Sequence, residues 1–354
     1  MNEMMPYILE QSTLCCHMLA DRIALAAPFV QALADHAPDR LVLVASGTSR
    51  NAACAAAPFM EQVLSLPVTV TAPSCLEQVA GKAPLLLFIS QGGNSTNTIA
   101  AIESHRDVPS LALTGNPDGE INALCDHAVF IPCGEEKAGP KTKGYTSTVL
   151  LLYIMALEAA KARHLLTESS YGEIVAALQT SANQMPENIR RVQVWETANL
   201  DTLKKIHTTY LIGKQQDAFV AAEGALKFME TILVPAFAFD FEEFLHGSAC
   251  SLDSHVSGFY ILPADKVDII RMERLIALHR ASCDAVYALC HTESNDSRDL
   301  CLLSSGHWYT APFEMILPFQ IISNDLPSLR GVNDLGHQRF VTLDSHLRIK
   351  AKAE

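Results

Sequence analysis

Short apolar runs alternate with longer helical stretches along most of this chain, and this alternation limits the possible folds. Each run is nearly continuous in aliphatic residues, which is typical of a strand buried on both faces. Strands separated by helices favour right-handed crossovers and a parallel sheet with helices on both sides. The sequence therefore predicts an α/β fold with doubly wound parallel sheets. The expected strands are 41–46, 67–71, 84–90, 109–114, 127–131, 208–213, about 235–239, 257–262, 285–290 and a weaker run near 301–304.

The expected strands form two sets that resemble each other. AAAPFMEQVLSLP at 55–67 is similar to EGALKFMETILVP at 223–235, and each stretch lies between two expected strands. Such self-similarity indicates tandem copies of one structural unit. We therefore predict two domains joined by a helical linker. The expected segments are a helical lead-in at 1–38, domains at 39–167 and 207–326, the linker at 168–206, and a tail at 327–354 with a short strand near 340–343.

Composition excludes some classes of partner. The chain has 354 residues, of which 49% are hydrophobic, and its formal net charge is −13. Nucleic-acid binding requires clustered Lys and Arg, so we expect no nucleic-acid partner. The sequence shows neither a membrane-spanning apolar stretch nor the basic start and apolar run of a signal peptide. We therefore expect a cytoplasmic protein with no membrane partner.

The ten cysteines are scattered and form no C-x-x-C pair. This pattern favours reduced, packed thiols over a disulfide framework. A catalytic cysteine is the alternative. The segment HGSACSLDSH at 246–255 contains two His and a Cys, but their spacing is not that of zinc ligands. We therefore expect no metal site.

Two of the expected strands are followed by loops rich in hydroxyl groups and glycine. The loops are SGTS at 46–49 and SQGGNS at 90–95. Neighbouring parallel strands end at the same edge of a sheet, where backbone N–H groups and the positive end of a helix dipole favour anions. The loops therefore predict a phosphate site. The alternative is two ordinary polar loops in which Ser95 or Thr96 caps the following helix.

These loops and three later motifs resemble the sugar isomerase (SIS) domain family, including the isomerase half of glucosamine-6-phosphate synthases. SGTS and SQGGNS are similar to the family's CGTS and SQSGET segments. The later motifs are AGPKTKGYTST at 138–148, EGALKFME at 223–230 and EEFLHG at 242–247, which resemble ASTKAFTT, EGALKLKE and GELKHG. The resemblance implies two tandem flavodoxin-like SIS domains that bind a small-molecule sugar phosphate and use no cofactor.

The resemblance also assigns substrate-binding residues one by one. Gly92 replaces a serine of the family and Asn94 replaces a glutamate, which removes a side-chain donor from the second loop. The segment KTKGYTS at 141–147 is expected to close over the sugar, and the alternative is a solvated charged patch. The residues expected to bind the sugar phosphate are Ser46, Gly47, Thr48, Ser49, Ser90, Gln91, Gly92, Asn94, Ser95, Glu136, Lys141, Glu223 and Arg339.

Three residues of the later motifs are expected to carry the chemistry. Aldose–ketose conversion requires a carboxylate that moves a proton between C1 and C2, and the resemblance gives this role to Glu230. It also requires a titratable group for ring opening, which the resemblance assigns to His246. Lys227 lies one helical turn before Glu230 and can stabilise a developing enolate. Taken singly, Glu230 would be a solvated carboxylate and His246 a turn histidine; together they favour function.

The reaction is predicted from differences between this chain and the synthases. The segment before the first expected strand is too short for a glutaminase domain, so we expect no glutamine-dependent amination. The synthases form a Schiff base through a lysine near their C-terminus. Arg339 falls near that position and cannot form an imine, whereas Lys350 and Lys352 are alternatives. The pattern resembles fructosamine-6-phosphate deglycases, which split a phosphorylated sugar–amino acid adduct into a hexose 6-phosphate and an amino acid.

Three other functions stay open. One is an aldose–ketose sugar-phosphate isomerase or an amino-sugar-phosphate deaminase on the same scaffold. The second is a non-catalytic sugar-phosphate-binding regulator, and the third is a structural dimer without a ligand. The family resemblance also implies a homodimer or higher homo-oligomer, in which His246 is contributed across the interface.

Overall fold

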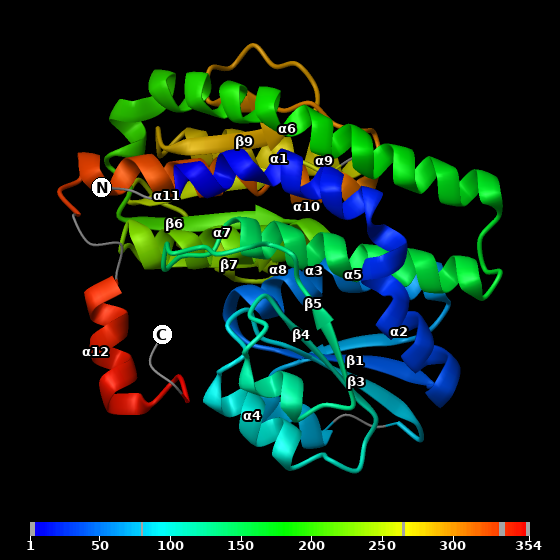
Figure 1. Ribbon diagram of the computed structural model, residues 1–354. Coiled ribbons are helices and arrows are strands. Elements are labelled where there is room, and N and C mark those ends of the chain that lie inside the picture. Colours follow the sequence, from blue (N-terminus) through cyan, green and yellow to red (C-terminus); the bar gives the residue numbers. More distant parts are fainter. Residues whose placement is uncertain (1–3, 79–80, 264–265, 333–336, 352–354) are drawn as a thin grey trace. The chain divides into compact units, whose positions relative to one another are not determined.

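The computed structural model of this chain describes residues 4–78, 81–263, 266–332 and 337–351. These residues form two five-stranded parallel sheets (Figure 1). The chain divides into two compact units, one around each sheet, and each is described by itself. The first-sheet unit comprises Thr13–Lys137, Lys143–Ala176 and His337–Glu354, and the second-sheet unit comprises Met1–Ser12, Ala138–Thr142 and Ala177–Gly336.

The first sheet has the strand order β2-β1-β3-β4-β5. This is the order of flavodoxin-like sheets, in which the chain reverses its winding direction beside the first strand. All neighbouring strands are parallel. The strands are β1 (Arg40–Ala45), β2 (Val68–Thr71), β3 (Pro84–Ile89), β4 (Ser110–Thr114) and β5 (His127–Phe130).

The second sheet repeats this order as β7-β6-β8-β9-β10. Helix α7 (Gln216–Thr231) connects its first two strands as α3 (Gly47–Leu64) does in the first sheet. The two similar stretches found in the sequence fall on these helices, and the predicted tandem α/β fold is confirmed. The strands are β6 (Thr208–Gly213), β7 (Ala236–Asp240), β8 (Val256–Ile261), β9 (Val286–Cys290) and β10 (Asp299–Cys301).

Helices occupy most of the connections between strands, and further helices precede β1 and follow β10 in the sequence (Figure 1). The other helices are α1 (Met5–Ala20), α2 (Arg22–His36), α4 (Thr96–Glu103), α5 (Lys143–Ala162), α6 (Glu168–Leu203), α8 (Phe241–Leu245), α9 (Lys266–Arg280), α10 (Ala311–Glu314), α11 (Leu317–Leu329) and α12 (His337–Leu347). Short 3₁₀ segments are η1 (Pro73–Gln78), η2 (Glu120–Ala123), η3 (Ser248–Ser251) and η4 (Trp308–Thr310).

The first sheet is buried on both faces, which explains the continuous apolar runs of its central strands. Val44 and Phe88 pack in a core cluster with Ile99 and Ile102 of α4. Alternate strand residues point to opposite faces of a sheet, and α3 also packs against β1 and β2 while α2 packs against β5. Helix α5 is buried around its whole circumference from Lys143 to Ala160. Both faces are therefore dry, and the polar groups of the unit are left to the strand ends and loops.

Two further sequence expectations concern the linker and the tail. Residues 168–203 form the single helix α6, as expected for the linker. The short strand expected near 340–343 is wrong, because these residues lie in α12, where the Thr342 hydroxyl donates to the Gln338 carbonyl. The domain boundaries stay predictions. Among the described residues no single helix could cross a membrane by length and apolarity, although α1 and α2 meet that test as a pair bent by 61°.

Candidate functional site

The first hydroxyl-rich loop lies at the carboxyl end of β1, where α3 begins. Ser46 is extended and directly precedes the helix, and Gly47 has a φ of +55°. A Cβ on Gly47 would meet no atom within 4 Å, so the space beside it is open. Thr48 and Ser49 follow in the first helical turn and are half-buried. Hydroxyl groups therefore gather at the end of α3 that favours anions.

The second loop follows β3, which pairs in register with β1. Ser90 is 4% exposed, and its Oγ lies 3.2 Å from Ser95 Oγ. Ser95 holds the N-cap position of α4, but its side chain does not cap the helix. Asn97 donates from Nδ2 to Ser46 Oγ over 3.0 Å. The structure therefore joins the two loops at one edge of the first sheet, and the Ser95 hydroxyl is directed to Ser90 rather than to the helix backbone.

Gly93 shapes the second loop by packing against the neighbouring loop after β4. Its φ is +72°, and a Cβ there would lie 2.6 Å from the Gly119 Cα. Asn94 Oδ1 accepts from the Glu120 backbone N over 3.1 Å, and Asn116 Nδ2 donates to the Gly92 carbonyl over 3.1 Å. The glycine at 93 is thus required by a close approach between two backbones. The side chain of Asn94 likewise supports the loop.

Gln91 connects the second loop to α5. Its Nε2 lies 2.7 Å from Cys133 Sγ, and its Oε1 accepts from Thr148 Oγ1 over 3.4 Å. Burial is the main cause of the raised pKa of Cys133, which the Glu136 charge raises further. A thiol held protonated in this way is a packing group and not a nucleophile. Gln91 is therefore fixed by two neighbours that the sequence did not identify.

The C-terminal segment of the first-sheet unit lies along the second loop. Ser95 and Lys350 form an antiparallel bridge, and the Thr96 backbone N donates to the Ile349 carbonyl over 3.2 Å. The Ala351 N donates to the Asn94 carbonyl over 2.9 Å. The Thr96 hydroxyl also reaches the Ile349 carbonyl. Sequence reasoning missed this contact, because nothing in the residues 348–351 indicates where they pair.

Glu136 and Lys141 both lie in the segment that precedes α5 in the sequence. Glu136 is 8% exposed, and its Oε2 accepts from the Gly144 backbone N over 3.1 Å. This carboxylate therefore satisfies a donor in the first turn of α5, where negative charge is favourable. Lys141 belongs to the second-sheet unit, and its Nζ donates to the Ala138 carbonyl over 3.1 Å. Sugar binding by these two residues stays a prediction.

In the second-sheet unit, Glu223, Lys227 and Glu230 lie together on α7. Lys227 is fully buried, with its Nζ 3.3 Å from Glu223 Oε1 and in an ion pair with Glu230 Oε2. Burial acts to lower the pKa of Lys227, but the two carboxylates outweigh it and the pKa is raised. Glu223 is 1% exposed, whereas the Glu230 side chain is 36% exposed. Lys227 therefore stays an ammonium that holds a solvent-facing carboxylate.

His246 directly follows α8, the short helix that begins immediately after β7. Asp240 fixes this helix, because its Oδ1 accepts from the Glu242 backbone N over 2.9 Å while its Oδ2 accepts from the Gln215 N over 3.0 Å. His246 is exposed and its backbone N donates to the Glu243 carbonyl. Among the described residues, no hydrogen bond or ion pair joins His246 to Glu230. The Asp240 cap was also missed by sequence reasoning.

Arg339 lies in the first turn of α12 in the first-sheet unit, and it is exposed. Lys350 lies instead at the second hydroxyl-rich loop. Lys352 is outside the described residues. Of Arg339 and Lys350, Lys350 is thus the residue that forms a backbone bridge to the second hydroxyl-rich loop.

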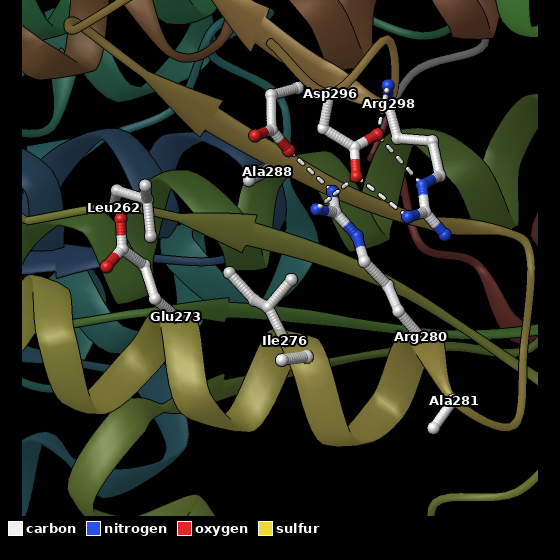
Figure 2. A pocket seen from close by; sticks show the side chains of 10 residues that line it. Leu262, Glu273, Ile276, Arg280, Ala281, Ala288, Asp296 and Arg298 are labelled. Atoms are coloured by element: carbon white, nitrogen blue, oxygen red, sulfur yellow. Dashed lines mark hydrogen bonds and ion pairs between the residues drawn. The ribbon is translucent and has the colours of Figure 1, made fainter. Parts of the chain in front are cut away.

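A cavity of about 540 Å³ lies in the second-sheet unit (Figure 2). It is formed between α9 and the strands β8 to β10. Arg280 extends from α9 to Asp296 (Figure 2), with Nη1 and Oδ2 separated by 3.1 Å. No predicted site residue lines this cavity. Among the described residues, no group of three or more His, Cys, Asp or Glu side chains is arranged to hold a metal ion.

Comparison with known families and curated proteins agrees with the fold. A family model for the SIS domain matches residues 36–158. Glutamine–fructose-6-phosphate aminotransferase (isomerizing) of Streptococcus pneumoniae R6 is 22% identical over 321 residues, which cover 89% of this chain and 52% of that protein. The chain thus spans about half the length of the curated relatives it matches.

Solved structures share the tandem arrangement. A candidate phosphosugar isomerase of Clostridium difficile 630 superposes with a TM-score of 0.88 at 23% identity, covering 96% of this chain and 97% of that one. The tagatose-6-phosphate ketose/aldose isomerase of Escherichia coli gives a TM-score of 0.73 at 17% identity, with 94% of each chain covered. The architecture is that of tandem SIS phosphosugar isomerases.

Proposed function

This chain carries a SIS domain at residues 36–158, and from that premise we propose that it is an enzyme acting on a hexose 6-phosphate derivative. The proposed reaction is deglycation, in which a 6-phosphorylated fructosamine is split into a hexose 6-phosphate and a free amino acid. The observation that carries the proposal is the pairing of a buried, charged Lys227 with the solvent-facing Glu230 on α7. A non-catalytic binding protein has no need for this pair.

The joined loops after β1 and β3 support phosphate binding. Ser46, Ser90 and Ser95 present hydroxyl groups where α3 and α4 begin, and two helix N-termini add partial positive charge. Such a site can hold a phosphate with few cationic side chains, which suits an acidic chain. In the proposed enzyme this site anchors the sugar at its 6-phosphate end, and binding there orients the other end for chemistry.

Glu230 acts as the base in the proposed mechanism. In the open-chain substrate the amine is attached to C1, and C2 is a ketone. Glu230 removes a proton from C1 and returns it to C2, which leaves an imine between C1 and the amine. Water adds to the imine carbon, and the C1–N bond breaks to give the aldose phosphate and the amino acid. The Lys227 ammonium stabilises the enolate oxygen that forms when the C1 proton leaves.

The raised pKa of Lys227 opposes a Schiff base at this lysine. A lysine must lose its proton before it attacks a carbonyl, and the pairing with Glu223 and Glu230 opposes that loss. A fructosamine already contains its amine, so no enzyme imine is required. His246 is proposed to assist ring opening from a neighbouring subunit of a homodimer, because its side chain is exposed at the end of α8.

An aldose–ketose isomerase is the second candidate, and the structural likeness to the tagatose-6-phosphate isomerase favours it. Both reactions use the same C1/C2 proton transfer and differ in whether an amine departs. The purified chain should be assayed with several 6-phosphofructosamines, with fructose 6-phosphate and with glucosamine 6-phosphate, following glucose 6-phosphate and free amine separately. Deglycation predicts equal release of both products from a fructosamine. If the chain converted only the ketose phosphate, the proposed deglycation would be wrong and the chain would be an isomerase.

A further inference from the structure

Two cysteines face each other on neighbouring strands of the second sheet. Cys290 ends β9 and Cys301 ends β10, and the two residues are paired in register. Their Sγ atoms are 3.3 Å apart. Register partners in a parallel pair lie about 4.8 Å apart and point to the same face. That spacing falls within the Cα separation of about 4.4–6.8 Å that disulfides require. A covalent bond could therefore form with little movement of either strand.

The two thiols differ in access. Cys290 is 3% exposed, whereas Cys301 is half-buried on the edge strand. Both Sγ atoms lie close to the Thr292 carbonyl, at 3.2 Å and 2.9 Å, which accepts their protons in hydrogen bonds. Burial raises the pKa of Cys290, and Cys301 and the Asp299 charge raise it further. An oxidant from solvent therefore meets Cys301 first, with Cys290 behind it.

We propose that Cys290 and Cys301 are an oxidation site that forms a reversible intrachain disulfide with a peroxide as oxidant. The Cys301 thiolate attacks one oxygen of hydrogen peroxide, which gives a sulfenic acid and releases the other oxygen as water. Cys290 then attacks the Cys301 sulfur, the S–S bond forms, and the hydroxyl leaves as a second water. Two electrons pass from the sulfurs to the peroxide, and the two thiol protons end in the two waters.

The disulfide would add a covalent bond at the carboxyl end of a short edge strand. At its amino end β10 is already held, because Arg280 pairs with Asp299 and with Asp296 of the connection from β9. Beyond its carboxyl end, the Leu303 backbone N donates to Asn188 Oδ1 on α6 over 2.7 Å. The disulfide closes the connection 291–300, part of which lines the cavity of Figure 2. Oxidation therefore restrains one wall of that cavity.

Peptide mapping tests the site directly, because Arg298 separates the two cysteines. Trypsin gives the peptides 281–298, with Cys283 and Cys290, and 299–330, with Cys301. The full-length chain, reduced and then treated with an equivalent of hydrogen peroxide, should yield these two peptides joined. The joined pair should be 2 Da lighter than the sum of the separate peptides, and dithiothreitol should separate it. The oxidised chain should also melt about 5 °C higher.

Three variants identify the partners. Cys283→Ser should keep the joined peptides, whereas Cys290→Ser and Cys301→Ser should lose them. Persistence of the joined pair in Cys290→Ser would assign the bond to Cys283 and overturn the proposal. Separate peptides from the oxidised wild-type chain would also overturn it, whatever the folding of the variants. No step of this test depends on enzyme activity, so it is independent of the proposed reaction.

Discussion

Ser90 and Ser95 are the residues through which phosphate binding is tested most simply. Their hydroxyls lie 3.2 Å apart at the start of α4. Ser90→Ala and Ser95→Ala each remove one donor to a phosphate that is bound equally in the ground and transition states. We expect KM for the phosphorylated substrate to rise about tenfold with kcat nearly unchanged. Steady-state kinetics measure both constants.

Ser104→Ala is the matched control for these variants. Ser104 follows the other end of α4, where its hydroxyl donates to the Ala100 carbonyl. Its removal should leave KM unchanged. Equal KM values for all three variants and the wild-type chain would place the phosphate elsewhere.

Gly93 allows a separate prediction on stability. An added Cβ must enter the left-handed region at a φ of +72° and would lie 2.6 Å from the backbone of Gly119. We expect Gly93→Ala to lower the free energy of unfolding by about 3 kcal/mol or more. Gly47→Ala has a similar φ but open space around it, so the expected cost is about 1 kcal/mol. Urea unfolding measures both; equal losses would show that the contact with Gly119 does not limit the loop.

At the scale of elements, the strands were the most predictable part of the fold. Runs such as LLLFI are buried on both faces, so their pattern depends on the sheet and hardly on distant context. The strand predicted near 340–343 was wrong for the opposite reason. Phe340, Val341 and Leu343 lie on the exposed helix α12, and β-branched or aromatic residues outside a core carry little information about structure.

The hydroxyl groups at the strand ends of the candidate site could be predicted from the sequence. The residues that hold the loops in place were less predictable. The order of strands and helices in the sequence indicates which residues follow a parallel strand. Ser46, Ser90 and Ser95 were predicted as site residues on this basis. The contact of Lys350 with Ser95 joins residues far apart in the sequence, and no local pattern encodes it. The same holds for Cys133 beside Gln91. Tertiary contacts of this kind require the structure.

A pair of carboxyl groups lies between helices α6 and α11. It makes the free energy of unfolding depend on pH. Glu196 of α6 is 5% exposed, and burial, followed by the charge and hydrogen bond of Asp325 of α11, raises its pKa to about 8. The ordinary value is 4.5. Between these values the folded chain keeps a proton that the unfolded chain releases. The free energy of unfolding should therefore fall as the pH rises through this window.

Glu196→Gln should remove that dependence. The amide resembles the protonated acid, so we expect the variant to gain about 3 kcal/mol over the wild-type chain between pH 5 and pH 8. Urea unfolding at several pH values measures the difference. Glu187→Gln, at an exposed carboxylate of the same helix whose pKa is lowered to about 2, should leave the slope in this window unchanged. Parallel slopes for wild type and Glu196→Gln would contradict the assignment.

At the scale of the whole molecule, the chain repeats one sheet topology and divides its polar groups between the copies. The hydroxyl loops belong to the first-sheet unit, whereas Glu230 and His246 belong to the second-sheet unit. We propose a homodimer in which His246 reaches a neighbouring subunit. Under that proposal, inactive His246→Ala and inactive Ser90→Tyr chains should regain activity when co-expressed. One of the two sites in each mixed dimer would then be intact.

The complementation is measured in purified heterodimers that carry two different affinity tags. Each variant homodimer, checked for folding by circular dichroism, is the baseline. The expected activity is about half that of the wild-type dimer, since one intact site remains of two. Verified heterodimers without activity would mean that each site is built within one chain.

In the proposed mechanism, Glu230 transfers the C1/C2 proton of a phosphorylated sugar. The most direct test is kcat/KM for hexose 6-phosphate release from a 6-phosphofructosamine by the wild-type chain and by Glu230→Gln. The amide keeps the shape of the side chain beside Lys227 but cannot accept the proton. We predict normal folding and a loss of about a thousandfold or more, with Glu187→Gln unaffected. Wild-type turnover retained in folded Glu230→Gln would contradict the account.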